Sequence, residues 1–184
     1  NADFSDRNKL RKIIDEHGTP DTLIHLGWGN TNDPHHKNHI TSNVNEGINL
    51  FDEMYNSGVQ RIIFMGSASE YGSQVGLLKE NFPSQEEGLN HYIKGKRTLG
   101  THGLQSAKEG KGIFIYVRLF YTYGAGQKTN SLINQLFQCS LGNEIMQLSP
   151  CEHFRDYIHV SDVAEGVKKL LNVDESGVVN LGSG

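Results

Sequence analysis

A serine-bearing turn and a tyrosine–lysine pair are the groups in this sequence whose types and spacing could move a proton. Ser67 follows the β-branched and aromatic run 59–65, which predicts a buried strand. Tyr92 and Lys96 are four residues apart, so a helix would place both side chains on one face. A nearby ammonium favours the charged form of a phenol, whose pKa is normally about 10. We therefore expect Tyr92 to exchange a proton near neutral pH while Ser67 hydrogen-bonds the same substrate oxygen.

A Tyr-x-x-x-Lys pair is a weak signal by itself, because an ordinary surface helix can carry a Tyr and a solvated Lys. Its position in the chain raises its weight. The pair follows a predicted strand and then a serine-bearing turn, in that order. Open α/β sheets bind their ligands at the carboxyl ends of the strands, where such turns lie. The order therefore favours a functional site over a surface helix.

The segments that must position these residues alternate between strand-like and helix-like patterns. The run 113–120 has the continuous apolar character of a parallel strand covered on both faces. The alternation is typical of βαβ units and predicts the α/β class with a doubly wound parallel sheet. In one predicted helix, we expect Leu132, Ile133, Leu136 and Phe137 to face the core. The predicted strands are 22–28, 59–65, 113–120, 154–160 and 178–181, with a strand end at 1–4, and the predicted helices are 5–18, 38–57, the segment bearing Tyr92, 131–141 and 161–171.

Length, charge and cysteine usage argue against several classes of protein. The chain has 184 residues, enough for one ordinary domain or most of one. Its net charge of −4 and isoelectric point near 6.1 argue against binding nucleic acid by phosphate neutralisation. It has no run of 18 apolar residues, so we expect no transmembrane helix and no membrane partner. Cys139 and Cys151 show no metal or redox spacing, which predicts free thiols in a cytoplasmic protein.

Several histidines and the tryptophan admit structural explanations. His35, His36 and His39 are close in sequence, but they occur in a polar loop without supporting carboxylates or cysteines, so we expect no metal site. His25 lies inside an apolar strand and is interpreted as a hydrogen-bonded core histidine. Trp28 follows the same strand and has two equal interpretations: it walls a sugar pocket, or it packs against the neighbouring helix.

Other motifs lie before and after the proposed catalytic residues, and they occur in a definite order along the chain. Together with Ser67 and the Tyr-x-x-x-Lys pair, these motifs resemble the extended short-chain dehydrogenases/reductases, specifically the NAD-dependent nucleotide-sugar epimerase, dehydratase and reductase group. The resemblance runs almost end to end and implies a Rossmann-type fold. The other matching segments are 3–4 (Asp-Phe), 24–27 (Ile-His-Leu-Gly), 43–47 (Asn-Val-Asn-Glu-Gly), 118–127 (Arg-Leu-Phe through Tyr-Gly-Ala-Gly-Gln), 155–160 (Arg-Asp-Tyr-Ile-His-Val) and 179–184 (Val-Asn-Leu-Gly-Ser-Gly).

The resemblance implies a hydride-transfer mechanism with NAD or NADP as cofactor and a nucleotide-diphosphate sugar as substrate. Ser67, Tyr92 and Lys96 fall on the catalytic positions, where Lys96 would lower the pKa of Tyr92 and hold the nicotinamide ribose. The resemblance also implies dimerisation through two helices, the predicted helix 38–57 and the predicted helix that bears Tyr92. The implied cofactor-binding residues are Asp3, Phe4, Leu26, Gly27, Trp28, Asn43, Tyr92, Lys96 and Leu119, and the implied substrate-binding residues are Ser67, Ser69, Ser131, Leu132 and Arg155.

The sequence also departs from the family pattern. Members that dehydrate keep an Asp-Glu pair directly after the catalytic Ser/Thr, whereas Ala68 and Ser69 stand here and Glu70 is one step out of place. Dehydration is therefore disfavoured. Tyr121 replaces an Asn that contacts substrate phosphate, and Gly95 replaces the Ser before the catalytic Lys.

The glycine-rich turn that seats the pyrophosphate of a dinucleotide does not occur in this sequence. In the family that turn lies upstream of the position of Asp3. The resemblance therefore implies a partial NAD(P)-binding domain over 1–184, without the N-terminal βαβαβ half and most of the C-terminal substrate lobe, in which 125–184 contribute to the nucleotide-sugar side. We expect a fragment of a longer protein, and the alternative is a truncated copy that holds no cofactor.

Three functional hypotheses follow. The leading one is a nucleotide-sugar 4-epimerase or 4-ketoreductase. The second is a catalytically silent member of the family with a binding or regulatory role, and the third is a 4,6-dehydratase. The motifs leave epimerase and reductase, NAD and NADP, and the identity of the sugar and its nucleotide as open alternatives.

Overall fold

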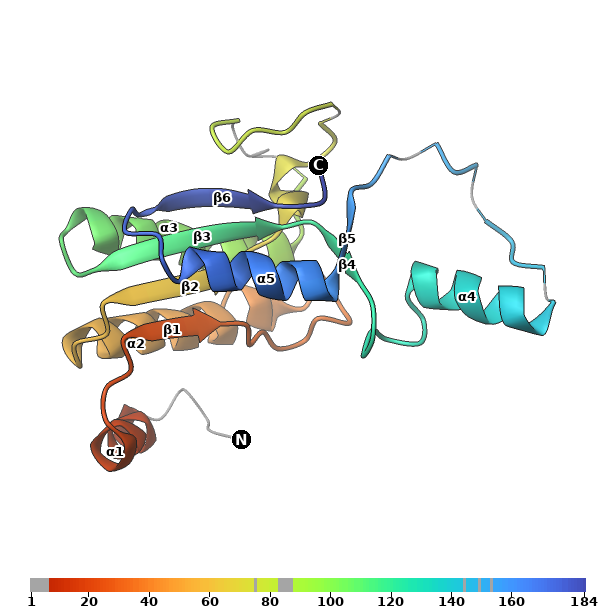
Figure 1. Ribbon diagram of the computed structural model, residues 1–184. Coiled ribbons are helices and arrows are strands. Elements are labelled where there is room, and N and C mark those ends of the chain that lie inside the picture. Colours follow the sequence, from red (N-terminus) through yellow and green to blue (C-terminus); the bar gives the residue numbers. More distant parts are fainter. Residues whose placement is uncertain (1–6, 75, 83–87, 144, 149, 153) are drawn as a thin grey trace.

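Helices and strands alternate along the chain in the computed structural model, which describes residues 7–74, 76–82, 88–143, 145–148, 150–152 and 154–184 (Figure 1). The predicted strand end at 1–4, with Asp3 and Phe4, lies outside these residues. The helices are α1 (Arg7–His17), α2 (Ser42–Asn56), α3 (His91–Lys108), α4 (Leu132–Gly142) and α5 (Val160–Leu170), with short 3₁₀ helices η1 (Lys37–His39) and η2 (Ala68–Tyr71). The strands are β1 (Thr22–His25), β2 (Arg61–Met65), β3 (Ile113–Leu119), β4 (Tyr121–Tyr123), β5 (Tyr157–His159) and β6 (Gly177–Leu181).

Four of the strands form a parallel sheet in the order β1-β2-β3-β6. Ile63 pairs with Ile24 on one side and Ile115 on the other, and Val117 pairs with Val179. Helices α2 and α3 cover one face of this sheet, and α5 covers the other (Figure 1). The α/β class and the doubly wound parallel sheet are therefore confirmed. Strands β4 and β5 form a separate parallel pair beyond the carboxyl end of β3.

The core is divided between the two faces of the sheet because successive strand residues point to opposite sides. Ile62 and Phe64 of β2 pack with Phe51 of α2 and Leu99 of α3, whereas Ile63 faces the cluster under α5. All five side chains are 0% exposed. Each such burial stabilises the fold by about 1.5–3 kcal/mol. The sheet is thus held from both sides, and its carboxyl edge is a firm base for loops.

Several predicted boundaries differ from the structure: β2 begins at Arg61 and not at residue 59, and β5 spans only Tyr157–His159 of the predicted 154–160. Two further differences have a visible cause. Helix α2 begins at Ser42, not near residue 38, because 37–39 form a separate 3₁₀ turn whose start is capped by the His36 side chain. Strand β1 ends at His25, three residues before the predicted end. The reason is that Trp28 turns away from the sheet and donates its Nε1 hydrogen to His39 Nδ1 at 2.9 Å.

The prediction that the apolar face of 131–141 packs into the core is wrong. Leu132, Leu136 and Phe137 are 44%, 38% and 60% exposed. Helix α4 has the expected amphipathic pattern, but it stands away from the main sheet (Figure 1), so its apolar face has no partner layer there. None of the helices in the described part of the chain is long and apolar enough to cross a membrane.

Candidate active site

The first component of the site is the turn that follows β2. Ser67 caps η2, and its Oγ accepts a hydrogen bond from the backbone N–H of Ser69 at 3.2 Å. Ser67 is 9% exposed, whereas Ser69 is exposed. The turn lies where a central strand of a parallel sheet ends, which is the edge at which such sheets bind ligands.

The second component is the first two turns of α3. Asn90 caps this helix by accepting a hydrogen bond from Ile93 N at 3.0 Å. Lys96 is 4% exposed, and its Nζ donates a hydrogen bond to the carbonyl oxygen of Met65 at 2.7 Å. This bond joins the Tyr92–Lys96 helix to the end of the strand that leads into Ser67. The structure therefore brings the Ser67 turn and Lys96 to one place.

Aromatic rings enclose the tyrosine–lysine pair. The ring of Tyr92 meets His39 edge-on at 5.4 Å and Trp28 edge-on at 6.3 Å between centroids. Lys96 Nζ lies 4.3 Å from the centroid of Trp28 and 5.9 Å from that of Tyr92. The indole of Trp28 packs against Tyr92 and Lys96 of α3, as one of its two interpretations has it, and it also lies 6.2 Å from the ring of Phe64 on β2.

This enclosure controls the charge states of the pair. Burial lowers the pKa of Lys96 to about 7, against the opposing effect of the Glu70 charge. Burial also raises the pKa of Tyr92, and Glu70 adds to that rise. The direction for Tyr92 is opposite to the predicted lowering by Lys96, because the surrounding rings exclude water from the phenol and disfavour its charged form.

A histidine that sequence reasoning assigned to a polar loop organises this enclosure. His39 is 0% exposed, and its Nδ1 accepts the hydrogen of Trp28 Nε1. An indole nitrogen can only donate, so His39 Nε2 carries the proton and donates to Asp33 O at 2.9 Å. Asn43, from α2, donates to Gly29 O at 3.1 Å. The loop after β1 is thus tied to η1 and α2. The many polar residues of this loop gave no indication that His39 is buried. The one signal in the sequence was that His39 lies just before a helix with an apolar face.

Gly95 explains how α3 approaches η1 so closely. A Cβ at this position would lie 2.0 Å from the backbone oxygen of His39 and 3.1 Å from Trp28. The departure of Gly95 from the family's Ser therefore has a structural reason in this chain.

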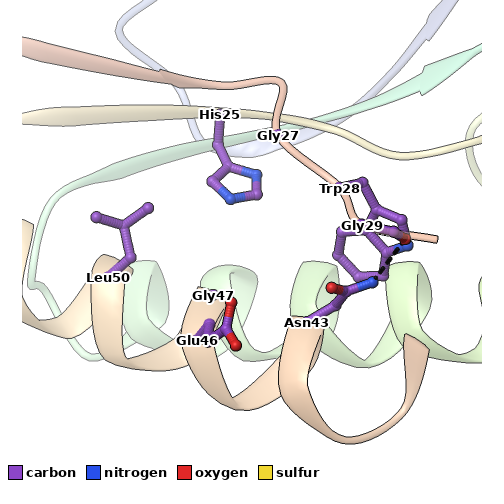
Figure 2. A pocket seen from close by; sticks show the side chains of 8 residues that line it. All are labelled: His25, Gly27, Trp28, Gly29, Asn43, Glu46, Gly47 and Leu50. Atoms are coloured by element: carbon purple, nitrogen blue, oxygen red, sulfur yellow. Dashed lines mark hydrogen bonds between the residues drawn. The ribbon is translucent and has the colours of Figure 1, made fainter. Parts of the chain in front are cut away.

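A cavity of about 200 Å³ lies between the end of β1 and helix α2 (Figure 2). The imidazole of His25 points into it from the strand, and Asn43 lies at its Trp28 end. Burial, followed by the charge of Lys96, lowers the pKa of His25 to about 4. His25 Nδ1 has no hydrogen-bond partner within the described residues, so the prediction of a hydrogen-bonded core histidine is wrong at that atom. The cavity is lined by His25, Gly27, Trp28, Gly29, Asn43, Glu46, Gly47 and Leu50.

A second, more open hollow of about 550 Å³ lies between the loop after β1 and the loop before α4. Lys128 spans the two loops, donating to Asn32 and, at 3.3 Å, to Thr31 Oγ1. Ser131 lines this hollow, and the Oγ of Ser131 is buried without a hydrogen-bond partner among the described residues.

The remaining predicted residues lie apart from the Ser67 turn. Arg155 is exposed, with its guanidinium 5.2 Å from the ring centroid of Tyr121. Leu26 is 65% exposed at the end of β1, and Leu119 packs beside the cluster under α5. Among the described residues, neither Arg155 nor Ser131 hydrogen-bonds to the proposed catalytic residues, and no group of three His, Cys, Asp or Glu side chains could hold a metal ion.

Comparison with known proteins agrees with this architecture. The model of the NAD dependent epimerase/dehydratase family matches residues 1–182. A UDP-glucose 4-epimerase from Neisseria meningitidis serogroup C is 28% identical over 212 residues, which cover 100% of this chain and 61% of that relative. The crystal structure of UDP-N-acetylglucosamine 4-epimerase from Bacillus cereus matches with a TM-score of 0.83 at 23% identity, covering 100% of this chain and 62% of that one.

MoeE5, solved in complex with UDP-glucuronic acid and NAD, matches with a TM-score of 0.79 at 24% identity, covering 100% of this chain and 62% of MoeE5. Both solved structures share the fold of this chain. The chain spans about three fifths of the length of the proteins that it matches.

Proposed function

Because the chain belongs to the NAD-dependent epimerase/dehydratase family, we propose that it carries the catalytic residues of a nucleotide-sugar 4-epimerase or 4-ketoreductase. The observation that carries this proposal is the hydrogen bond from Lys96 Nζ to Met65 O, which holds the Tyr92 helix against the strand end of Ser67. A phenol, an ammonium and a hydroxyl then share one edge of the sheet. That set suits removal of a proton from a sugar hydroxyl.

NAD is the cofactor of this family, and the residues present fit its nicotinamide end. A Cβ at Gly27 would meet nothing within 4 Å, so the strand-end turn is open to a ligand. We assign Leu26, Gly27, Trp28 and Asn43 of this edge to cofactor binding, with Tyr92, Lys96 and Leu119 completing the set. Asp3 and Phe4 keep the same assignment as a prediction from sequence.

NAD, when bound, supplies a hydride acceptor for a sugar carbon and returns the hydride afterwards. Tyr92 takes the proton of the hydroxyl on that carbon, for which it must first be ionised. Ser67 hydrogen-bonds the same oxygen and orients it. Lys96, fixed by the Met65 carbonyl, places an ammonium near the phenol, and its charge opposes the rise in the pKa of Tyr92 that burial causes.

The second hollow is the place that we assign to the nucleotide part of the substrate. Lys128 and the backbone before α4 offer donors to a diphosphate, and Ser131 contributes a buried hydroxyl. Arg155 has a guanidinium that can bind phosphate in a bidentate fashion. We therefore propose that 125–184 form the nucleotide-sugar side, with Ser131, Leu132 and Arg155 as contacts and with Ser69 near the sugar.

A 4,6-dehydratase activity is disfavoured by the same geometry. Dehydration needs an acid and a base beside the sugar, and Ala68 and Ser69 supply neither. The nearest carboxyl group in sequence, Glu70, is 0% exposed and receives the hydroxyl of Tyr116, so it faces the core.

The test is turnover of UDP-glucose and UDP-N-acetylglucosamine, with NAD present, by the protein and by its Tyr92→Phe variant. We expect formation of the 4-epimer or, for a reductase run in reverse, oxidation of the C4 hydroxyl to a 4-keto sugar with matching reduction of NAD to NADH, and a loss of about 10²–10⁴-fold in the variant. Circular dichroism serves as the folding control. Normal turnover by Tyr92→Phe would contradict the catalytic assignment. Absence of both turnover and nucleotide release from the purified protein would favour the catalytically silent alternative.

A further inference from the structure

A buried carboxylate with no part in the proposed reaction lies directly behind the Ser67 turn. Glu70 belongs to η2 and is 0% exposed. Tyr116 of β3 donates its hydroxyl proton to Glu70 Oε1, and Arg118 Nε lies 3.4 Å from Glu70 Oε2. Helix η2 packs against both β3 and α3. The carboxylate therefore lies between the sheet and the helix that bears the proposed catalytic pair.

Two glycines make room for this arrangement. The ring of Tyr116 stacks on Phe64 at 5.5 Å between centroids and is 2% exposed. A Cβ at Gly66 would lie 2.2 Å from Tyr116 Cε2, and a Cβ at Gly100 would lie 2.5 Å from Cε1. The ring thus passes between the end of β2 and α3, and glycine at both places lets its hydroxyl reach Glu70.

Arg118 extends the network away from the site. Its Nη1 donates to the hydroxyl of Tyr71 at 2.9 Å and to Glu80 O at 3.1 Å. Tyr71 in turn donates to Asn180 Oδ1 at 2.8 Å. Glu70 is therefore fixed by β3 and β6 as well as by its own turn. A buried carboxylate held in this way is costly to displace.

The charge of Glu70 acts on the groups proposed to be catalytic. Burial lowers the pKa of Lys96 to about 7, and the negative charge of Glu70 opposes that effect. Burial raises the pKa of Glu70 itself, while Tyr116 and Arg118 favour its ionised form. The titratable groups around the site come from five elements: His25 of β1, His39 of η1, Glu70 and Tyr71 of η2, Tyr92, Lys96 and Arg97 of α3, and Tyr116 and Arg118 of β3.

We propose that Glu70 is a positioning residue of the site: held by Tyr116 and Arg118 beneath the Ser67 turn, it supplies the negative charge that keeps Lys96 an ammonium. This inference rests on the proposed function, because the charge of Lys96 matters for turnover only if Tyr92 is the base.

The test is a pH titration of Lys96 by NMR in the protein labelled with ¹³C at the lysine Cε, with the Lys96 signal assigned by Lys96→Arg. In Glu70→Gln, which keeps the shape of the side chain, we expect the Lys96 midpoint to fall by roughly one pH unit. Tyr116→Phe removes the hydroxyl that stabilises the carboxylate, so it should lower the midpoint in the same direction by less. Both variants are expected to remain folded by circular dichroism.

Glu53→Gln is the matched control. Glu53 is 4% exposed and pairs with Arg11, so this variant also removes a buried, arginine-paired carboxylate, but on α2. We expect it to leave the Lys96 midpoint unchanged. An unchanged midpoint in Glu70→Gln, or an equal fall in Glu53→Gln, overturns the inference whatever the turnover.

Turnover separates this inference from the proposed function. If Lys96 acts as an ammonium, the alkaline limb of kcat/KM follows its titration, and Glu70→Gln should move that limb to lower pH. A parallel fall of the NMR midpoint and the kinetic limb supports both. If the NMR midpoint of Lys96 falls in Glu70→Gln but the protein shows no turnover, the effect of the Glu70 charge on Lys96 is supported and the proposed function is overturned.

Discussion

Lys96 shows how a single residue can be held in a state that its side chain disfavours. It is 4% exposed and lies beneath an indole ring, yet its Nζ is kept in place by the carbonyl of Met65. Burial lowers its pKa to about 7, far below the ordinary value of 10.5. The position therefore works against stability near neutral pH, which is common at functional sites.

The consequence for stability can be measured with Lys96→Met. The unfolded chain keeps Lys96 protonated up to about pH 10.4, so between about pH 7 and that value it binds more protons than the folded chain. The contribution of Lys96 to the free energy of unfolding should then increase with pH across this window, by roughly 1 kcal/mol per pH unit. Urea unfolding at pH 7, 8 and 9 should show the advantage of Lys96→Met over the wild type shrinking as pH rises. An advantage that is constant over pH would contradict the lowered pKa.

At the scale of elements, the close contact of α3 with η1 sets the position of Tyr92. Gly95 faces the backbone oxygen of His39, where a Cβ would lie at 2.0 Å. The N–H of Tyr92 donates to Pro34 O at 2.9 Å in the same region. The first turn of α3 is thus pressed against the loop after β1.

Gly95→Ala should force these two elements apart. We expect a loss of about 1–3 kcal/mol in the free energy of unfolding, because an overpacked contact with backbone cannot relax by a rotamer change. Urea unfolding measures it, and Thr101→Ala, at an exposed position of the same helix, is the control. Equal free energies of unfolding for Gly95→Ala and the wild type would contradict the close contact between α3 and the backbone of His39.

The helices and strands also show which parts of the fold and of the site could be predicted from the sequence alone. Apolar periodicity and capping residues predicted the helices and, apart from β4, the strands along the chain, because these signals are local. The start of α2 was misplaced because His36 caps a separate turn, a contact that periodicity does not report. For the site, the i, i+4 spacing of Tyr92 and Lys96 predicted a shared helix, but the pKa direction of Tyr92 depends on rings from the loop after β1. Burial by distant segments is what the local pattern lacks.

At the scale of the whole molecule, stability resides in the sheet and the helices that cover it. Leu99 is 0% exposed in the cluster between the sheet and the α2 and α3 layer. Helix α4 stands apart, with Leu136, Phe137 and Leu141 at 38%, 60% and 67% exposed. A large apolar side chain therefore contributes more to the free energy of unfolding in this cluster than on α4.

Replacing Leu136, Phe137 and Leu141 together by Gln should leave the free energy of unfolding unchanged within about 0.5 kcal/mol, since exposed side chains contribute little. Leu99→Ala should lower it by about 2–5 kcal/mol, because it opens a cavity in the core. Chemical denaturation of both variants compares the two directly. A large loss in the α4 variant would mean that this helix packs more extensively than its exposure indicates.

Trp28 is the only tryptophan in the sequence, and its ring lies over Lys96 and beside His39 and Tyr92. The intrinsic fluorescence of the protein at tryptophan wavelengths therefore originates at the proposed site. A ligand that enters this edge of the sheet, or a change in the charge of Lys96, alters the surroundings of the single emitting group. The molecule thus contains its own optical probe, with which cofactor binding can be titrated in the unlabelled protein.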